Sequence, residues 1–209
     1  LDGSDHRADG GGIKPGGILY SGPITINQST QITARAKGTG DFFGGWSGLS
    51  QGLFSIEVPA DATNLRITEL HYHPANPTPA ELALVPGVED DDFEFIEFYN
   101  PTIDSISLNN VRFTDGVAFD FSTGDVTSLG PGETVVVVEN LAAFDARYGS
   151  SMLIAGEYTN NLSNGGEQVI LVDANDGIIH SFLYSDDAPW PAVADGGGPS
   201  LEVVSTTGN

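Results

Sequence analysis

Cysteine is absent from the 209-residue chain. This absence excludes a disulfide framework, a cysteine-ligated zinc site and a thiol nucleophile. Long apolar runs are missing as well, and no stretch approaches the ~20 consecutive apolar residues of a membrane-spanning helix. We therefore expect no membrane insertion, and a fold held together by a hydrophobic core, for which a 39% hydrophobic content is sufficient.

Basic residues are scarce. Seven Lys and Arg stand against 29 Asp and Glu, for a net charge of −22, and no lysine follows Lys37. Such an acidic surface repels phosphate, which excludes DNA, RNA and anionic lipid as partners. The charge is also uneven, because residues 63–209 hold 23 of the acids and only three arginines. This step predicts a domain boundary, with residues 59–64 as a linker between a first region, 1–58, and a domain over 65–205.

Turn-forming residues are abundant, with 27 Gly and 12 Pro, which disfavours a helical bundle. Period-two alternation predicts two strands in the first region, Ile24–Ala36 and Phe54–Val58. In the second region it predicts strands at Leu65–Tyr72, Phe93–Tyr99, Ser107–Phe113, Thr134–Glu139, Gln168–Val172, Ile178–Tyr184 and Ser200–Val204. Short strands joined by turns predict an all-β, antiparallel β-sandwich.

Two local features have sharper signals. Asn140 precedes Leu141, Phe144 and Tyr148 at helical spacing, and Gly149 follows them, so the sequence predicts a capped helix over 140–148. The turn residues 173–177 lie between two predicted strands, which indicates a hairpin with Gly177 at positive φ.

Several spaced motifs of the second region resemble those of bacterial lamin tail domains. They are residues 66–74 (RITELHYHP), 93–100 (FEFIEFYN), 108–115 (LNNVRFTD), 129–133 (LGPGE), 162–167 (LSNGGE), Trp190-Pro191 and 196–202 (GGGPSLE). The resemblance covers residues 65–204 in the family's order and implies an immunoglobulin-like β-sandwich without catalytic activity.

The first region resembles the C-terminal part of a chitobiase/β-hexosaminidase C-terminal-type module, which is also immunoglobulin-like. The resemblance rests on residues 1–5 (LDGSD), on Tyr20 with Pro23-Ile24, and on residues 30–36 (TQITARA), and it departs from the family pattern at His6. The family's preceding strand is absent, so we expect the chain to begin inside a domain. This implies a smaller, incomplete β-sandwich module over residues 1–58.

Together the two resemblances imply a secreted or cell-surface bacterial protein in which such modules flank other domains. We expect a structural or interaction module, not an enzyme, with an unidentified protein or polysaccharide surface as its partner. Two alternatives remain open. One is a carbohydrate-binding accessory module of an extracellular hydrolase, and the other is a metal-dependent enzyme.

The enzyme alternative depends on Glu69, His71 and His73, whose i, i+2, i+4 spacing places them on one face of a regular strand. A carboxylate and two imidazoles suit zinc or iron. However, Leu65 and Leu70 belong to opposite apolar phases, which predicts a bulge near Thr68. After the bulge we expect the histidines to face solvent or the following loop.

The densest acidic run includes Asp90, Asp91, Asp92 and Glu94. Carboxylate oxygens at this density suit Ca²⁺, so the run is a candidate calcium site. For a non-catalytic module we expect no cofactor other than this calcium. The competing interpretation is a solvated loop leading into a strand.

Trp46 follows two glycines, in Gly44-Gly45-Trp46, and is the candidate aromatic platform for a sugar ring. The alternative is that the indole closes one end of the first module.

Overall fold

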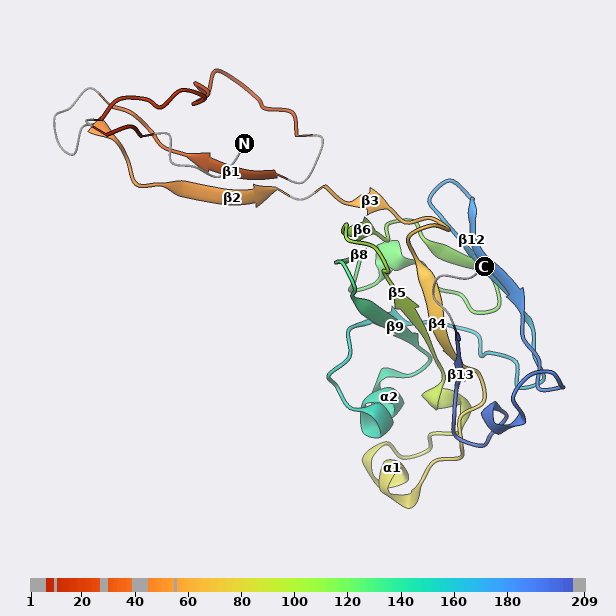
Figure 1. Ribbon diagram of the computed structural model, residues 1–209. Helices are drawn as coiled ribbons and strands as arrows, with labels where there is room; N and C mark the ends of the chain where they lie inside the picture. The colour runs from red at the N-terminus through yellow and green to blue at the C-terminus, as the bar shows by residue number, and fades with distance from the viewer. Residues whose placement is uncertain (1–6, 10, 27–29, 39–44, 55, 205–209) are drawn as a thin grey trace. The chain divides into compact units, whose positions relative to one another are not determined.

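The computed structural model describes residues 7–9, 11–26, 30–38, 45–54 and 56–204. It divides into two compact units, residues 1–57 and residues 58–209 (Figure 1). In the first unit, β1 (Thr30–Ala34) and β2 (Ser50–Phe54) form an antiparallel pair. The predicted strand over 24–36 is therefore shorter, and the predicted strand over 54–58 is wrong, since β2 ends at Phe54. Residues 1–5, which carry part of the chitobiase-type resemblance, lie outside the described residues.

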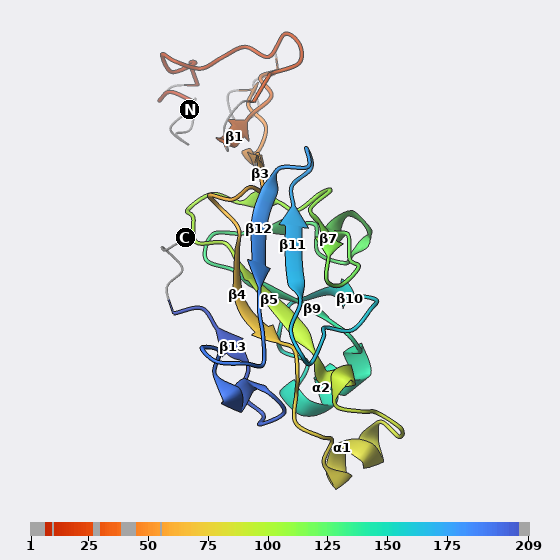
Figure 2. The ribbon, with the colours of Figure 1, turned by 90° about the vertical axis from the view of Figure 1, so that its right-hand side faces the viewer.

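The second unit is built mainly of three sheets. The five-stranded sheet has the spatial order β10 (Ile154–Glu157), β9 (Thr134–Val138), β5 (Phe95–Tyr99), β4 (Arg66–His71) and β13 (Leu201–Glu202). A three-stranded sheet has the order β12 (Ile178–Leu183), β11 (Gln168–Val172) and β7 (Arg112–Asp115). A second three-stranded sheet has the order β3 (Val58–Pro59), β6 (Ile106–Ser107) and β8 (Ser128–Leu129). The helical elements are α1 (Pro79–Leu84), α2 (Leu141–Tyr148) and the 3₁₀ turns η2 (Asp91–Phe93), η3 (Phe121–Thr123) and η4 (Ala192–Ala194). Figure 2 shows the β12–β11 hairpin in front of β4, β5 and β9.

The main core lies between the five-stranded sheet and the three-stranded sheet that contains β11. Ile96 and Phe98 of β5 and Leu171 of β11 are fully buried in this core. The alternate residues, such as Phe95, face the other side of the large sheet and pack against Phe144 of α2. The alternation expected of a β-sandwich is thus confirmed, and α2 covers the outer face of its larger sheet.

Two strand pairs are parallel, contrary to the expectation of a fully antiparallel sandwich. β10 pairs with β9 in parallel because α2 lies in the connection and returns the chain to the same end of the sheet. β3 pairs in parallel with β6, through Val58 opposite Ile106. Residues 59–64 therefore do not form a linker in the structure, since Pro59 belongs to β3 and Ala60 is buried.

The predicted strand over 107–113 is two strands that belong to different sheets. β6 ends at Ser107 and β7 begins at Arg112, with Asn110 between them at φ 63°. The left-handed conformation suits asparagine and turns the chain from one sheet to the next.

The hairpin over 173–177 is confirmed, but the residue at positive φ is Asp176 (φ 64°), not Gly177. Glycine is required for a different reason. A Cβ on Gly177 would lie 2.5 Å from Oδ2 of Asp173, whose carboxylate accepts hydrogen bonds from the N–H groups of Asn175 and Gly177.

The segment 117–126, called the closing segment below, joins the edges of the two facing sheets. It bonds to the β7 side through Phe113 N–H, which donates to the Phe119 carbonyl (3.1 Å), and to β10 through Asp125 N–H, which donates to the Ala155 carbonyl (2.7 Å). Both β7 and β10 are edge strands, so the closing segment covers one open side of the sandwich.

Candidate functional site

The bulge predicted in β4 is present, as the pairing of β4 with β5 shifts register between Ile67 and Glu69. After the bulge, Leu70 and Tyr72 point into the main core, and Glu69 and His71 point to the outer face. There α2 covers His71, which is 3% exposed, so the expectation that this histidine faces solvent or the loop is wrong. The sequence pattern gives no sign of which strand face the helix covers.

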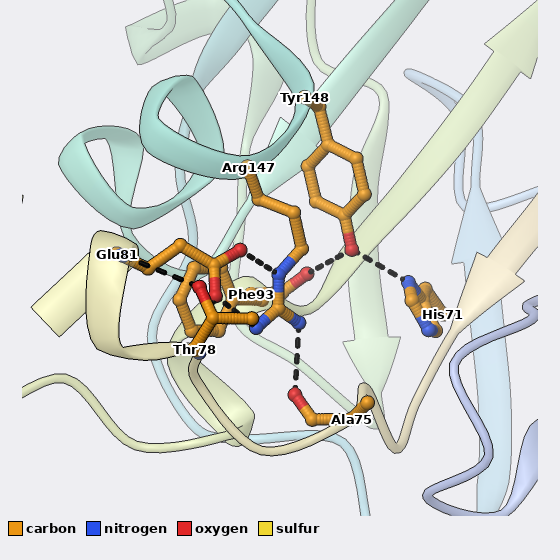
Figure 3. A network of polar contacts seen from close by, with 7 residues as sticks. All are labelled: His71, Ala75, Thr78, Glu81, Phe93, Arg147 and Tyr148. Carbon is orange, nitrogen blue, oxygen red and sulfur yellow. Dashed lines mark hydrogen bonds and ion pairs between the residues drawn. The ribbon is translucent and has the colours of Figure 1, made fainter.

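His71 belongs to a polar network beneath α2 (Figure 3). The Tyr148 hydroxyl lies 3.0 Å from Nδ1 of His71 and 3.4 Å from the Phe93 carbonyl oxygen. Burial, reinforced by the charge of Arg147, lowers the pKa of His71 to about 4. The imidazole is therefore neutral at pH 7 and acts as a structural partner of Tyr148.

Arg147 connects α2 to α1 in the same network. Its Nε donates to Oε1 of Glu81 (2.7 Å), and its Nη1 donates to the Ala75 carbonyl (2.9 Å). The guanidinium carbon lies 3.4 Å from the centre of the Phe93 ring. Glu81 also forms a capping box with Thr78, and the hydrogen bond from Arg147 is the main reason that its pKa falls to about 2.

Glu69 and His73 have separate partners. The Ser200 hydroxyl donates to the Glu69 carboxylate. Nδ1 of His73 lies 2.5 Å from the Asp195 carboxylate, and its Nε2 lies 3.4 Å from the Asp90 carboxylate. Within the described ranges, no group of three or more His, Cys, Asp or Glu side chains is placed to hold a metal ion. The triad of the enzyme alternative is thus divided among three different structural contacts.

The acidic run turns through η2 and is held by asparagine amides. Asn161 and Asn164 donate to the Asp91 carboxylate (3.0 and 3.2 Å), and Asn140, the cap of α2, donates to Asp92 (3.0 Å). These contacts join η2 to α2 and to the loop that follows β10. Asp90 and Asp91 thus serve contacts within the fold, with His73 and the asparagines respectively.

Glu94 is fully buried next to this run. The Tyr158 hydroxyl and the Leu162 N–H group both donate to Oε2 of Glu94 (2.9 Å each). Burial, together with the neighbouring carboxylates of Asp91 and Glu139, raises the pKa of Glu94 to about 9. Burial and the charge of Asp92 raise the pKa of Glu139 to about 7. No pattern in the sequence indicates a carboxyl group that is neutral at pH 7, because the groups that bury Glu94 come from loops distant in the chain.

Trp46 is half-buried in the first unit. Its Nε1 donates to the Gly11 carbonyl (2.9 Å), and the Lys37 ammonium lies 5.5 Å from the centre of the ring. These contacts hold the indole within its own unit.

A cavity of about 450 Å³, called the Phe119 pocket below, opens where the closing segment crosses from β7 to β10. Its lining comprises Arg112, Phe113, Ala118, Phe119, Asp120, Thr123, Gly124, Asp125, Ala155, Gly156 and Glu157. The residues come from three separate elements, so no spacing in the sequence brings them together. Sequence reasoning missed this pocket completely.

Among the described residues, no helix is long and apolar enough to span a bilayer. Comparison with curated proteins found no match, and comparison with solved structures found none. The family model of the lamin tail domain matches residues 59–186. The resemblance of residues 1–58 to a chitobiase-type module stays a prediction, because the matched region does not include them. Since the match covers more than half of the chain and the fold is the expected all-β sandwich, the chain belongs to the lamin tail domain family.

Proposed function

We propose that the chain is a non-catalytic interaction module of a secreted or cell-surface bacterial protein, with further domains beside it in a longer parent. Lamin tail domains are structural, non-enzymatic β-sandwiches, which supports the first part of the proposal. The main supporting observation is that the reactive side chains make contacts within the fold. Arg147 of α2 pairs with Glu81 of α1, and His71 of β4 contacts Tyr148 of α2. These side chains therefore join structural elements instead of facing a substrate cavity.

The charge supports the kind of partner that we propose. An acidic surface of this density excludes nucleic acid and anionic lipid but attracts basic partners over a long range. We propose a protein partner. The carbohydrate alternative has less support, because Trp46 is held by Gly11 and Lys37.

The purified chain distinguishes these functions. We expect it to stay in solution when mixed with insoluble chitin, cellulose or peptidoglycan, and to release no product from chromogenic ester, glycoside and phosphate substrates. Polysaccharide binding that disappears in Trp46→Ala would instead establish the carbohydrate alternative. Turnover that disappears in His73→Ala, in a protein that still folds, would establish the enzyme.

The location has its own test. Brief protease treatment of intact producing cells should release peptides of this chain into the supernatant, while a cytoplasmic marker protein stays intact. Release of its peptides after cell lysis alone would overturn the proposed location.

A further inference from the structure

The Phe119 pocket has the size of a ligand site, since pockets for small ligands usually have ~300–1,000 Å³. It opens over two sheet edges that the closing segment already covers with backbone hydrogen bonds. An added β-strand therefore has no free edge to pair with here. What the pocket offers is a place for a side chain.

One wall of the pocket is aromatic and fixed. Phe119 is half-buried and packs edge-on against the buried Phe121, with 5.0 Å between ring centres. Glycines flank the ring: a Cβ on Gly124 would lie 2.9 Å from its Cζ, and a Cβ on Gly156 would lie 3.0 Å from its Cε2. The two glycines therefore let the backbone come close to the ring without a side chain between them.

The other groups in the pocket give it an excess of negative charge. Asp120, Asp125 and Glu157 all line it. Asp120 accepts a hydrogen bond from Ser122 N–H, and Glu157 accepts one from Leu141 N–H, each through a single oxygen. For Asp125, no side-chain hydrogen bond or ion pair occurs with any described residue.

Arg112, the one cation among the described residues of the lining, is already engaged. The Arg112 guanidinium pairs with the Asp176 carboxylate and lies within hydrogen-bond distance of the Asn110 and Asp173 carbonyl oxygens (3.3 and 3.5 Å). An entering cation thus meets three carboxylates and an aromatic ring, within a unit that is itself strongly acidic.

We propose that the Phe119 pocket binds a basic side chain of a partner protein, preferentially arginine. This inference rests on the proposed interaction function. Carboxylates accept charge-assisted hydrogen bonds from a guanidinium, and a ring face attracts a cation. Arginine suits this combination better than lysine because its planar group can pair with carboxylates and stack on a ring at the same time.

The test uses the intact chain and a defined probe, acetyl-Gly-Arg-Gly-amide. Its citrulline counterpart has nearly the same shape but no charge. In amide NMR titrations we expect the arginine peptide to shift resonances of Ala118, Gly124 and Gly156. The citrulline peptide should bind at least about tenfold more weakly, which corresponds to about 1.4 kcal/mol.

Charge-removing variants locate the binding. Asp125→Asn combined with Glu157→Gln should weaken binding of the arginine peptide about fivefold or more, since each variant removes one ion pair with the guanidinium. Glutamine retains the oxygen that accepts from Leu141 N–H. Asp104→Asn, an exposed acid outside the pocket lining, is the matched control and should change affinity less than about twofold.

Two results would overturn the assignment. Equal binding of the citrulline peptide would show that charge is not recognised, and an equal loss in Asp104→Asn would show attraction to the whole surface. If Asp125→Asn with Glu157→Gln lowers the melting temperature, Asp125→Asn alone is the decisive variant, because its carboxylate has no side-chain partner in the described chain. Either failure leaves the polysaccharide, substrate and protease experiments above unaffected, so the proposed function is judged separately.

Discussion

Arg147 and Glu81 form a two-point ion pair, with Nε 2.7 Å from Oε1 and Nη2 3.2 Å from Oε2. Both side chains are largely buried, at 15% and 11% exposure. The pair joins the last turn of α2 to the first turn of α1, and the Phe93 ring lies against the guanidinium. Among the described residues, this is the buried ion pair that links α1 to α2.

Arg147→Met should lower the free energy of unfolding by about 3 kcal/mol, because it leaves the Glu81 carboxylate buried without its cation. For a domain of this size that is a drop of about 10 °C in the melting temperature, measured by circular dichroism. Arg112→Met is the control. Its partner Asp176 is 77% exposed, so the loss there should be about 1 kcal/mol or less. Equal losses in the two variants would contradict a special contribution of the buried pair.

Glu94 should make the protein less stable as the pH rises. Its pKa is about 9 when folded and near 4.5 when unfolded, so the folded state binds more protons between these values. The stability that this group contributes is complete below about pH 4.5 and is lost as the pH rises through 9.

Glu94→Gln should therefore flatten the decline of the melting temperature between pH 7 and 9.5 and make the variant the more stable protein at pH 9.5. Glutamine can still accept from Leu162 N–H. Glu89→Gln removes one carboxylate from an exposed position nearby and should leave the decline unchanged. Parallel pH profiles for all three proteins would argue against a protonated Glu94 in the folded state.

Asn140→Ala should cost about 1–2 kcal/mol. The Asn140 side chain accepts from Ala143 N–H at the start of α2, and its amide donates to Asp92. Chemical denaturation is the measurement. Asn140→Asp keeps the cap but places a negative charge beside Asp92, so it should recover only part of the loss. Full recovery would mean that the bond to Asp92 contributes nothing.

Calcium at 10 mM should raise the melting temperature no more than NaCl at the same ionic strength, because Asp91 and Asp92 already accept from asparagine amides and Glu94 is neutral at pH 7. Salt itself should stabilise the chain, as it screens repulsion between acids. A larger shift with calcium that disappears in Asp91→Asn would instead establish a calcium site in the acidic run.

The parts of the fold that sequence could predict are those with local causes. The alternation of Ile96 and Phe98 with the outward residues of β5 fixed that strand's inner face, and Asn140 with Gly149 fixed both ends of α2. The bulge in β4 followed from the phase change between Leu65 and Leu70. In each case the deciding residues are neighbours in the chain.

The site depended on distant contacts, and there sequence reasoning failed. Whether His71 faces water depends on α2, about 70 residues later, and the neutral state of Glu94 depends on Tyr158 and Leu162. The run over 107–113 shows the same limit, because the pattern interpreted as one strand does not reveal that Asn110 turns the chain into another sheet.

The position of β3 has a mechanical consequence. Its backbone pairing with the chain around β6 includes two hydrogen bonds, from Val58 N–H to the Ser105 carbonyl and from Ala60 N–H to the Ser107 carbonyl. If the parent protein is under tension, force that enters from the N-terminal side reaches these two bonds before it reaches β4 and the main sheet. β3 would then detach first and lengthen the chain by a few residues, and Ala60 would leave the edge of the core before β4, the main sheet or the Phe119 pocket opens.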